Sequence, residues 1–313
     1  MKIFVTGGAG FVGSHMVDAL LEDQTNDVTI YDNFSTGQAG HLEHVRNNPE
    51  LKIVQGDLLD VPALNKSICG HDLVFHFAAN SDISKGADNP GIDFRQTVVA
   101  TFNLLEAMRL GGVSRIAFAS GSGVYGDQGT FDTSETFGPL LPISMYGAGK
   151  LAAEAMISSH AHMFDITAYV FRFANVVGAR QTHGVAYDFI RKLKENPSKL
   201  QILGDGLQSK SYIHVSDVVS AIMFVVENGK SRVNLFNIAT GDYVTVHWIA
   251  EQVVKAMGLK DVDFDFAAGS RGWKGDIPIV RFNLDKICEL GWKAKADSRR
   301  AIQQSVAEML REL

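Results

Sequence analysis

The sequence contains few of the residues that would hold a metal ion or cross-link a small secreted fold. It has only two cysteines among 313 residues, Cys69 and Cys288, and they lie far apart. Two such cysteines cannot build a disulfide framework, and their spacing matches no zinc-ligand pattern. Low cysteine content is typical of a protein in a reducing compartment. The ten histidines have no accompanying set of Cys, Asp or Glu ligands, so we expect no metal.

The sequence also lacks an excess of basic residues and any long apolar run. Its 29 Lys and Arg face 35 Asp and Glu, which gives a net charge of −6. This balance argues against a nucleic-acid partner, although local basic residues could still hold a phosphorylated substrate. No apolar stretch approaches membrane-spanning length, and the chain opens directly on an apolar strand pattern rather than a signal peptide. We therefore expect a cytoplasmic protein with no membrane partner.

Short apolar runs alternate with amphipathic stretches through the first half of the chain. This pattern indicates an α/β fold, a doubly wound parallel sheet of the Rossmann-like type, with a smaller mixed α/β C-terminal substrate lobe. The sequence predicts strands at 2–6, 27–31, 51–55, 72–77, 115–120, 166–172 and 233–239, and helices at 14–22, 91–110, 146–163, 245–257 and 285–290. Residues 1–175, joined by about 212–240, form the predicted NAD-binding domain. Residues 176–211 and 241–313 form the predicted lobe.

A glycine-rich turn follows the first predicted strand. Gly7, Gly10 and Gly13 stand between that strand and a helix, in the spacing of a dinucleotide-binding turn. Such a turn lets the backbone approach a pyrophosphate, whose charge is stabilised at the helix N-terminus. Asp32 ends the second predicted strand, where an acid can bind the adenosine ribose hydroxyls of NAD and would repel the 2′-phosphate of NADP. The sequence therefore predicts NAD as cofactor.

Tyr146 and Lys150 are the main catalytic candidates. They are four residues apart in a predicted helix, so the phenol and the ammonium lie on one face. A nearby ammonium stabilises a phenolate and lowers the pKa of the tyrosine, which would make Tyr146 a base for a sugar hydroxyl. The same spacing also occurs between unrelated surface residues. Its position after the fifth predicted strand of a dinucleotide-binding fold favours the catalytic interpretation.

The whole chain resembles the extended short-chain dehydrogenases/reductases, in particular the NAD-dependent nucleotide-sugar epimerases and dehydratases. Matching motifs follow in order along the chain. They are Thr6–Gly13 (TGGAGFVG), Tyr31–Gly37 (YDNFSTG), Gly56–Leu58 (GDL), His76–Ala79 (HFAA), Asn103–Ala107 (NLLEA), Val124–Gly126 (VYG), Tyr146 with Lys150, Phe171–Gly178 (FRFANVVG), Gly204–Gly206 (GDG), Tyr212–Val215 (YIHV) and Leu290–Trp292 (LGW). So many ordered matches make coincidence a poor explanation.

The resemblance implies a role for particular residues. The implied NAD-binding residues are Gly7, Gly10, Phe11, Val12, Gly13, Asp32, Asn33, Asp57, Leu58, Ala78, Ala79, Tyr146 and Lys150. The implied substrate-binding residues are Asn175, Lys210, Arg271, Trp273 and Lys274, which would hold a nucleotide-diphosphate sugar. Lys210 stands where the family usually has an arginine, so it can supply charge but no bidentate fork. A solvated basic loop is the alternative for 270–276.

The chain departs from the family at two positions. The family has Ser or Thr four residues before the tyrosine of Val-Tyr-Gly, where this chain has Gly121. Sugar dehydratases carry Thr-Asp-Glu there, so this chain lacks the acid/base pair of a 4,6-dehydratase. Ser120 or Ser122 could supply the missing catalytic hydroxyl, or both could only satisfy the end of the strand. Thr97 is the second departure, since the family often has Asn there.

The resemblance favours a nucleotide-sugar 4-epimerase that oxidises C4 with NAD. A net C4 dehydrogenase that releases a 4-keto sugar shares the same residues, and Gly121 is compatible with such a partial reaction. A catalytically silent NAD-sensing protein is a third alternative, because fold alone does not establish activity. The family further implies a homodimer, formed by the helices at 91–110 and 146–163, and a role in polysaccharide biosynthesis.

Overall fold

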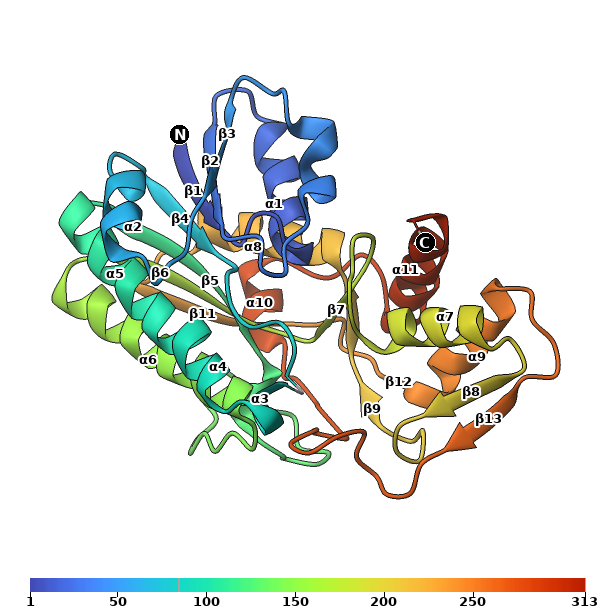
Figure 1. Ribbon diagram of the computed structural model, residues 1–313. Coiled ribbons are helices and arrows are strands. Elements are labelled where there is room, and N and C mark those ends of the chain that lie inside the picture. Colours follow the sequence, from blue (N-terminus) through green and yellow to red (C-terminus); the bar gives the residue numbers. More distant parts are fainter. Residues whose placement is uncertain (84, 313) are drawn as a thin grey trace. The chain divides into compact units, whose positions relative to one another are not determined.

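A computed structural model describes residues 1–83 and 85–312 (Figure 1). These residues form two compact units, each made of several chain segments. The first unit contains residues 1–124, 145–172 and 222–236, and the second contains 125–144, 173–221 and 237–313. The predicted domain division, with its boundary at 175 and a return over about 212–240, stays a prediction. In the compact units, residues 125–144 belong with the later segments.

A seven-stranded sheet forms the centre of the first unit. Only the C-terminal ends of two of its strands, from Phe173 and from Asn237 onward, are assigned to the second unit. Its strands are β1 (Lys2–Thr6), β2 (Asp27–Asp32), β3 (Leu51–Gln55), β4 (Leu73–His76), β5 (Arg115–Gly121), β6 (Thr167–Phe173) and β11 (Val233–Ile238). Their order is β11-β6-β5-β4-β1-β2-β3. The β1–β2, β1–β4, β2–β3 and β4–β5 pairs are parallel. The predicted doubly wound parallel sheet is therefore confirmed.

Helices cover both faces of this sheet. In Figure 1, α2 (Val61–Ile68), α5 (Ala100–Gly111) and α6 (Met145–Met163) lie along one face. The other face is covered by α1 (Phe11–Leu21) and by the part of α8 (Val215–Asn228) from Ile222 onward, which belongs to the same unit. The first of these faces packs around a core that includes Phe4, Leu104, Phe118 and Ile157. Buried apolar side chains such as these supply the main stabilisation of the layers.

The predicted helix over 91–110 has an irregular middle. It consists of α4 (Gly91–Asp93), a π-helix (Phe94–Val99) and α5, and it follows the short α3 (Lys85–Asp88). A π-helix inserts one residue into the α-helical register, and such insertions are frequent at functional sites. The other predicted helices agree with the structure to within three residues at each end. No helix in the described part of the chain is long and apolar enough to cross a membrane.

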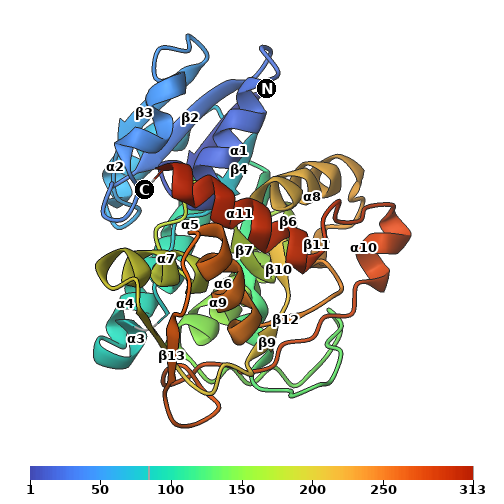
Figure 2. The ribbon, with the colours of Figure 1, turned by 90° about the vertical axis from the view of Figure 1, so that its right-hand side faces the viewer.

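The second unit is a smaller mixed α/β structure. It contains β7 (Asn175–Val177), α7 (Val185–Glu195), β8 (Lys199–Ile202), β9 (Ser209–Lys210), β10 (Tyr212–His214), β12 (Val244–Thr245), α9 (Val246–Ala256), β13 (Asp263–Phe266), α10 (Asp285–Leu290) and α11 (Ser298–Glu312). Figure 2 shows α7, α9 and α11 beside one another, where they share a core that includes Phe189, Ile249 and Ile302. Its strands form two-stranded pairs: β7 with β10, β8 with β13 and β9 with β12.

Candidate functional site

The glycine-rich turn connects β1 to α1 and has no room for side chains. Gly7 has a φ of +69°, which favours glycine, and a Cβ atom there would lie 2.6 Å from the backbone nitrogen of Ala78. A Cβ atom at Gly13 would overlap the carbonyl oxygen of Gly7. The glycines therefore keep the backbone open where the sequence predicts a pyrophosphate.

The N-terminus of α1 has no side-chain cap. Gly10 is the N-cap residue, and Phe11 and Val12 are the first residues of the helix. The N–H groups of a first helical turn have no acceptor within the helix, and the helix dipole is positive there. The arrangement therefore fits the diphosphate of a dinucleotide.

Asp32 holds the glycine turn against the end of β2. Its Oδ2 accepts a hydrogen bond from the backbone N–H of Ala9 at 2.9 Å, and its Oδ1 accepts one from Phe34 at 2.8 Å. Asn33 donates to Oδ2 of Asp57 at 2.9 Å. Each carboxylate oxygen of Asp32 keeps a second lone pair. The contacts therefore fix Asp32 in place and leave capacity to accept from ribose hydroxyls.

The remaining predicted cofactor residues lie after β3 and β4 in the same unit. Leu58 is buried in the core, whereas Ala78 and Ala79 are partly exposed in the segment that follows β4. The backbone N–H of Ala78 points to Oγ1 of Thr6 at 3.4 Å. The small side chains of Ala78 and Ala79 leave the backbone accessible beside the glycine turn.

Tyr146 and Lys150 lie on α6 as the spacing predicts. The Lys150 side chain is buried, with 3% of its surface exposed, and Tyr146 is partly exposed. The Lys150 ammonium donates to the carbonyl oxygen of Ala119 at 2.7 Å. Its nitrogen lies 4.8 Å from the ring centre of Phe118 and 5.7 Å from that of Tyr146. The aromatic rings partly compensate the ammonium for its lost hydration.

The pKa of Tyr146 does not follow the prediction from spacing. Burial, followed by the negative charge of Asp93, raises the pKa of Tyr146 to about 12. Burial also lowers the pKa of Lys150 to about 8, against the opposing charges of Glu154 and Asp93. The pKa of Tyr146 is therefore raised overall, and not lowered as the spacing predicts. Desolvation disfavours the charged forms of both groups, the phenolate and the ammonium. The negative charge of Asp93 disfavours the phenolate of Tyr146 further.

The two serines near Gly121 have different surroundings. Ser120 is buried in β5, and its hydroxyl donates to Glu154, whose carboxylate is paired with Arg172 at 2.7 Å. Ser122 is partly exposed, and its hydroxyl has no hydrogen-bond partner within residues 1–83 and 85–312. A Cβ atom at the next residue, Gly123, would lie 3.8 Å from Cδ1 of Tyr146. Ser122 is therefore adjacent in sequence to a residue that packs against the catalytic candidate.

Three residues of this region were not predicted as functional. Glu154 continues the series of Tyr146 and Lys150 at four-residue spacing, so the helical pattern could have indicated it. Its partner Arg172 belongs to the Phe171–Gly178 motif, but only the fold brings the two together. Asp93 is buried beside the same helix, and no local pattern in the sequence indicates it.

In the second unit, Lys210 has an ion-pair partner of its own. Its ammonium donates to Oδ1 of Asp276 at 2.7 Å, and both side chains are largely buried. It also lies 5.3 Å from the ring centre of Trp273. The structure therefore shows Lys210 joining two segments of the unit, so its charge is not freely available to an anion.

The loop at 270–276 is held by Arg271. Its guanidinium donates to Oδ2 of Asp127 at 2.7 Å and to the carbonyl oxygen of Asp276 at 3.1 Å. Trp273 and Lys274 are exposed. Asn175 begins β7 and donates to the carbonyl oxygen of Ser211. All five predicted substrate residues therefore belong to the second unit, on its loops and short strands.

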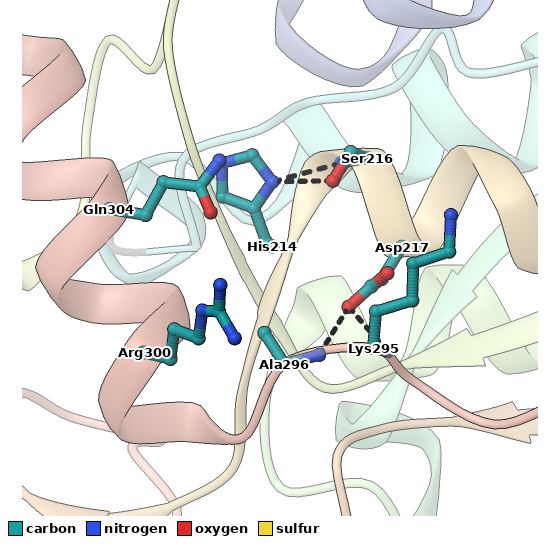
Figure 3. A pocket seen from close by; sticks show the side chains of 7 residues that line it. All are labelled: His214, Ser216, Asp217, Lys295, Ala296, Arg300 and Gln304. Atoms are coloured by element: carbon teal, nitrogen blue, oxygen red, sulfur yellow. Dashed lines mark hydrogen bonds between the residues drawn. The ribbon is translucent and has the colours of Figure 1, made fainter.

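The second unit also has a cavity of about 180 Å³, shown in Figure 3. It is lined by His214, Ser216, Asp217, Lys295, Ala296, Arg300 and Gln304, none of which was predicted as a site residue. Asp217 accepts from the backbone N–H groups of Lys295 and Ala296, and His214 bonds Ser216 at 2.7 Å. This volume is below the range of about 300–1,000 Å³ that is typical of ligand pockets. The described residues also contain no group of three metal-ligating side chains.

Comparison with known proteins gives consistent matches over the full length. Residues 3–239 match the NAD dependent epimerase/dehydratase family. The chain is 33% identical to a putative UDP-glucose 4-epimerase of Methanocaldococcus jannaschii, over 97% of each chain. It is 33% identical to a UDP-glucose 4-epimerase of Mycolicibacterium smegmatis, over 98% of this chain and 97% of the relative. A crystal structure of a UDP-galactose 4-epimerase is similar over 100% of both chains, with 37% identity and a TM-score of 0.89.

Proposed function

The chain belongs to the NAD dependent epimerase/dehydratase family, and on this premise we propose that it is a nucleotide-sugar 4-epimerase. The relatives named above are epimerases of UDP-glucose and UDP-galactose, which favours a UDP-linked hexose as the substrate. The observation that carries the proposal is the position of Tyr146 and Lys150. They lie on one helix face, in the same unit as a glycine turn that fits a dinucleotide.

Tyr146 and Lys150 would handle the proton of the sugar hydroxyl. NAD, when bound by the glycine turn and Asp32, supplies the acceptor for the C4 hydride and the donor that returns it to the opposite face. Tyr146 removes the proton from the oxygen on C4 and later gives it back. Lys150 stabilises the phenolate, and its ammonium is directed by the Ala119 carbonyl and the ring of Phe118.

We assign the missing catalytic hydroxyl to Ser122 and not to Ser120. The Ser120 hydroxyl is buried and donates to Glu154, so reorienting it would leave a buried carboxylate with one fewer donor. Ser122 is partly exposed, and its hydroxyl has no partner among the described residues. Its neighbour Gly123 packs against the first turn of α6, which carries Tyr146. Ser122 can therefore bond a substrate without breaking an internal contact.

The proposed activity is tested with UDP-glucose and UDP-galactose separately, with NAD present. We expect NMR to show interconversion of the two sugars and no net accumulation of NADH. Tyr146→Phe should reduce turnover by at least about 100-fold, because general base catalysis contributes roughly 10²–10⁴. Undiminished turnover in this variant would refute the mechanism. No turnover on any UDP-, GDP-, CDP- or dTDP-sugar would instead favour the NAD-sensing alternative.

A net C4 dehydrogenase is the second candidate, and Gly121 is the observation that favours it. The assay separates the two, because a dehydrogenase would accumulate NADH and a 4-keto sugar in equal amounts. Ser122→Ala and Ser120→Ala form a matched pair for the hydroxyl. We expect Ser122→Ala to lower kcat by about 10-fold or more, while Ser120→Ala mainly lowers thermal stability. The reverse result would transfer the assignment to Ser120.

For the substrate, we propose that Arg271, Trp273 and Lys274 contact the nucleotide diphosphate. Arg271 retains further N–H donors beyond its two observed acceptors, and Lys274 is exposed. Lys210 would act indirectly, since its bond to Asp276 supports the loop that carries Trp273. Asn175 would add an amide contact. Arg271→Lys should raise KM for the nucleotide sugar more than it lowers kcat, because the planar fork is lost.

We further propose that the protein is a homodimer formed by α5 and α6. Exposed apolar side chains occur on or next to both helices: Phe102 and Leu110 on α5, and Met163 and Phe164 at the end of α6. Burial of such side chains in a symmetric interface would stabilise two copies together. Mass measurement in solution tests this state directly.

A further inference from the structure

Asp93 is a fully buried carboxylic acid at the irregular helix of the first unit. It ends α4, immediately before the π-helix Phe94–Val99. Its Oδ1 accepts a hydrogen bond from Nδ2 of Asn80 at 3.0 Å. Its Oδ2 is buried and has no hydrogen-bond partner among the described residues. Because an unpaired buried carboxylate oxygen is costly, its retention here calls for an explanation other than stability.

Asp93 packs against the helix turn that carries Tyr146 and Lys150. A Cβ atom at Gly149 would lie 3.6 Å from Cβ of Asp93, an ordinary van der Waals contact, so Asp93 lies directly beside this turn of α6. Gly149 stands three residues after Tyr146 and one before Lys150. On the other side, a Cβ atom at Gly86 would lie 2.8 Å from Oδ2 of Asp93. The acid is thus enclosed between α3 and α6.

The charged and titratable groups that face Asp93 come from two elements. Lys150 acts on it from α6, where Asp93 in turn acts on Tyr146, and Asp82 acts from the segment after β4, where Asn80 also donates its hydrogen bond. Burial raises the pKa of Asp93, while the Asn80 bond and Lys150 lower it. In return, the carboxylate raises the pKa of Tyr146 and that of Lys150. Asp93 therefore acts on both members of the catalytic pair in the same direction.

We propose that Asp93 is a positioning residue whose negative charge sets the pH range in which Tyr146 and Lys150 work. This inference rests on the proposed function, since it concerns the same pair. Asp93 is fully buried, so it acts on the reaction only through the phenol and the ammonium. It disfavours phenolate formation and favours the charged ammonium, which places both titrations at higher pH than they would have without it.

Asp93→Asn removes the charge and keeps an amide oxygen to accept from Asn80. Loss of the negative charge makes the Tyr146 phenol more acidic and the Lys150 ammonium more acidic as well. The acidic limb of kcat/KM reports the base, and the alkaline limb reports the group that must stay protonated. We therefore expect both limbs to move to lower pH by about one unit, the size produced by one nearby charge. A merely structural role for Asp93 would lower the profile without moving both limbs together.

The control is Asp88→Asn, which removes an exposed carboxylate five residues away in the chain. It should leave both limbs in place. Asp93→Glu retains the charge and should keep the limbs at the wild-type positions. Asp93→Glu also tests the proposal if Asp93→Asn does not fold. In that case, limbs of the pH profile that move in Asp93→Glu would contradict the proposed role of the charge.

A second readout does not depend on activity. NMR of protein labelled in its tyrosine rings follows each phenol, and Tyr146→Phe assigns the signal of Tyr146. The Tyr146 signal should titrate at lower pH in Asp93→Asn than in the wild type and in Asp88→Asn. An unmoved titration would refute the role of Asp93. Absence of turnover in every variant would refute the proposed function, and the phenol titration would still decide the role of Asp93.

Discussion

Replacement of Lys150 by Met should stabilise the protein while abolishing turnover. Lys150 is almost fully buried, and its ammonium has no ion-pair partner within 4 Å in the described part of the chain. Burial lowers its pKa from 10.5 to about 8. A change of about 2.5 units corresponds to roughly 3 kcal/mol, which is the cost of keeping the buried ammonium charged at pH 7. Met retains most of the volume of the side chain and has no charge to desolvate.

Two lost interactions reduce this gain. The Ala119 carbonyl loses its donor, which costs about 1 kcal/mol. The cation–π contact with the Phe118 ring is lost as well, which costs about 0.5 kcal/mol. We therefore expect a net stabilisation of about 2 kcal/mol at pH 7.

The pH dependence of this stabilisation follows from the sign of the Lys150 pKa shift. Below pH 8, Lys150 is charged in both the folded and the unfolded state, and the full cost is present. Between pH 8 and 10.5 the unfolded state binds the extra proton, so wild-type stability rises and the advantage of Met disappears.

Urea unfolding at pH 7 and at pH 10.5 tests this reasoning. The three tryptophans, Trp248, Trp273 and Trp292, all belong to the second unit, so circular dichroism is needed to follow the first. Lys66→Met is the control, because Lys66 is an exposed lysine on α2 of the same unit. It should change stability by less than about 0.5 kcal/mol. A destabilised Lys150→Met protein at pH 7, or an advantage that persists at pH 10.5, would refute the argument.

Three further predictions concern the turn, the buried ion pair and the dimer. Gly13→Ala should weaken NAD binding by at least about 10-fold in calorimetry and lower stability by about 1–3 kcal/mol, because the new Cβ atom overlaps a carbonyl oxygen. The control is Gly40→Ala, which should change neither quantity because the space around Gly40 is open. Glu154→Gln should lower stability by about 3 kcal/mol in thermal unfolding, because Arg172 is left charged and buried; an unchanged melting temperature would contradict this. Phe102→Glu should convert a dimer into a monomer in light scattering, and a wild-type monomer would contradict the proposed dimer.

The glycine turn of the candidate cofactor site could be predicted because its requirements are local. Gly7 and Gly13 are needed where the backbone leaves no space for a Cβ atom, and this need appears directly as glycine in the sequence. Asp32 ends a short apolar run that is typical of a buried strand. The four-residue spacing of Tyr146 and Lys150 also correctly predicted that both lie on one helix. In each case the relevant residues lie within one strand–turn–helix segment or one helix.

The parts that could not be predicted depend on contacts between distant segments. Lys210 and Asp276 are 66 residues apart, and nothing near Lys210 indicates that its charge is already paired. The strands β9 and β12 have two residues each, so they exist through their mutual pairing and show no periodicity of their own. The break after Asp93 was also missed, because a π-helix adds one residue without changing the apolar character of the segment.

The serine choice shows how one change in backbone conformation decides a chemical role. In a continuous strand, Ser120 and Ser122 would lie on the same face, because side chains alternate with a period of two. β5 ends at Gly121, and a 3₁₀-helix begins at Ser122. This change of conformation separates the two hydroxyls: Ser120 remains on the buried side with Glu154, and Ser122 stays partly exposed. If Ser122 acts as we propose, the change of conformation after Gly121 moves the candidate hydroxyl by one residue along the chain, and the usual serine or threonine is not required at position 121.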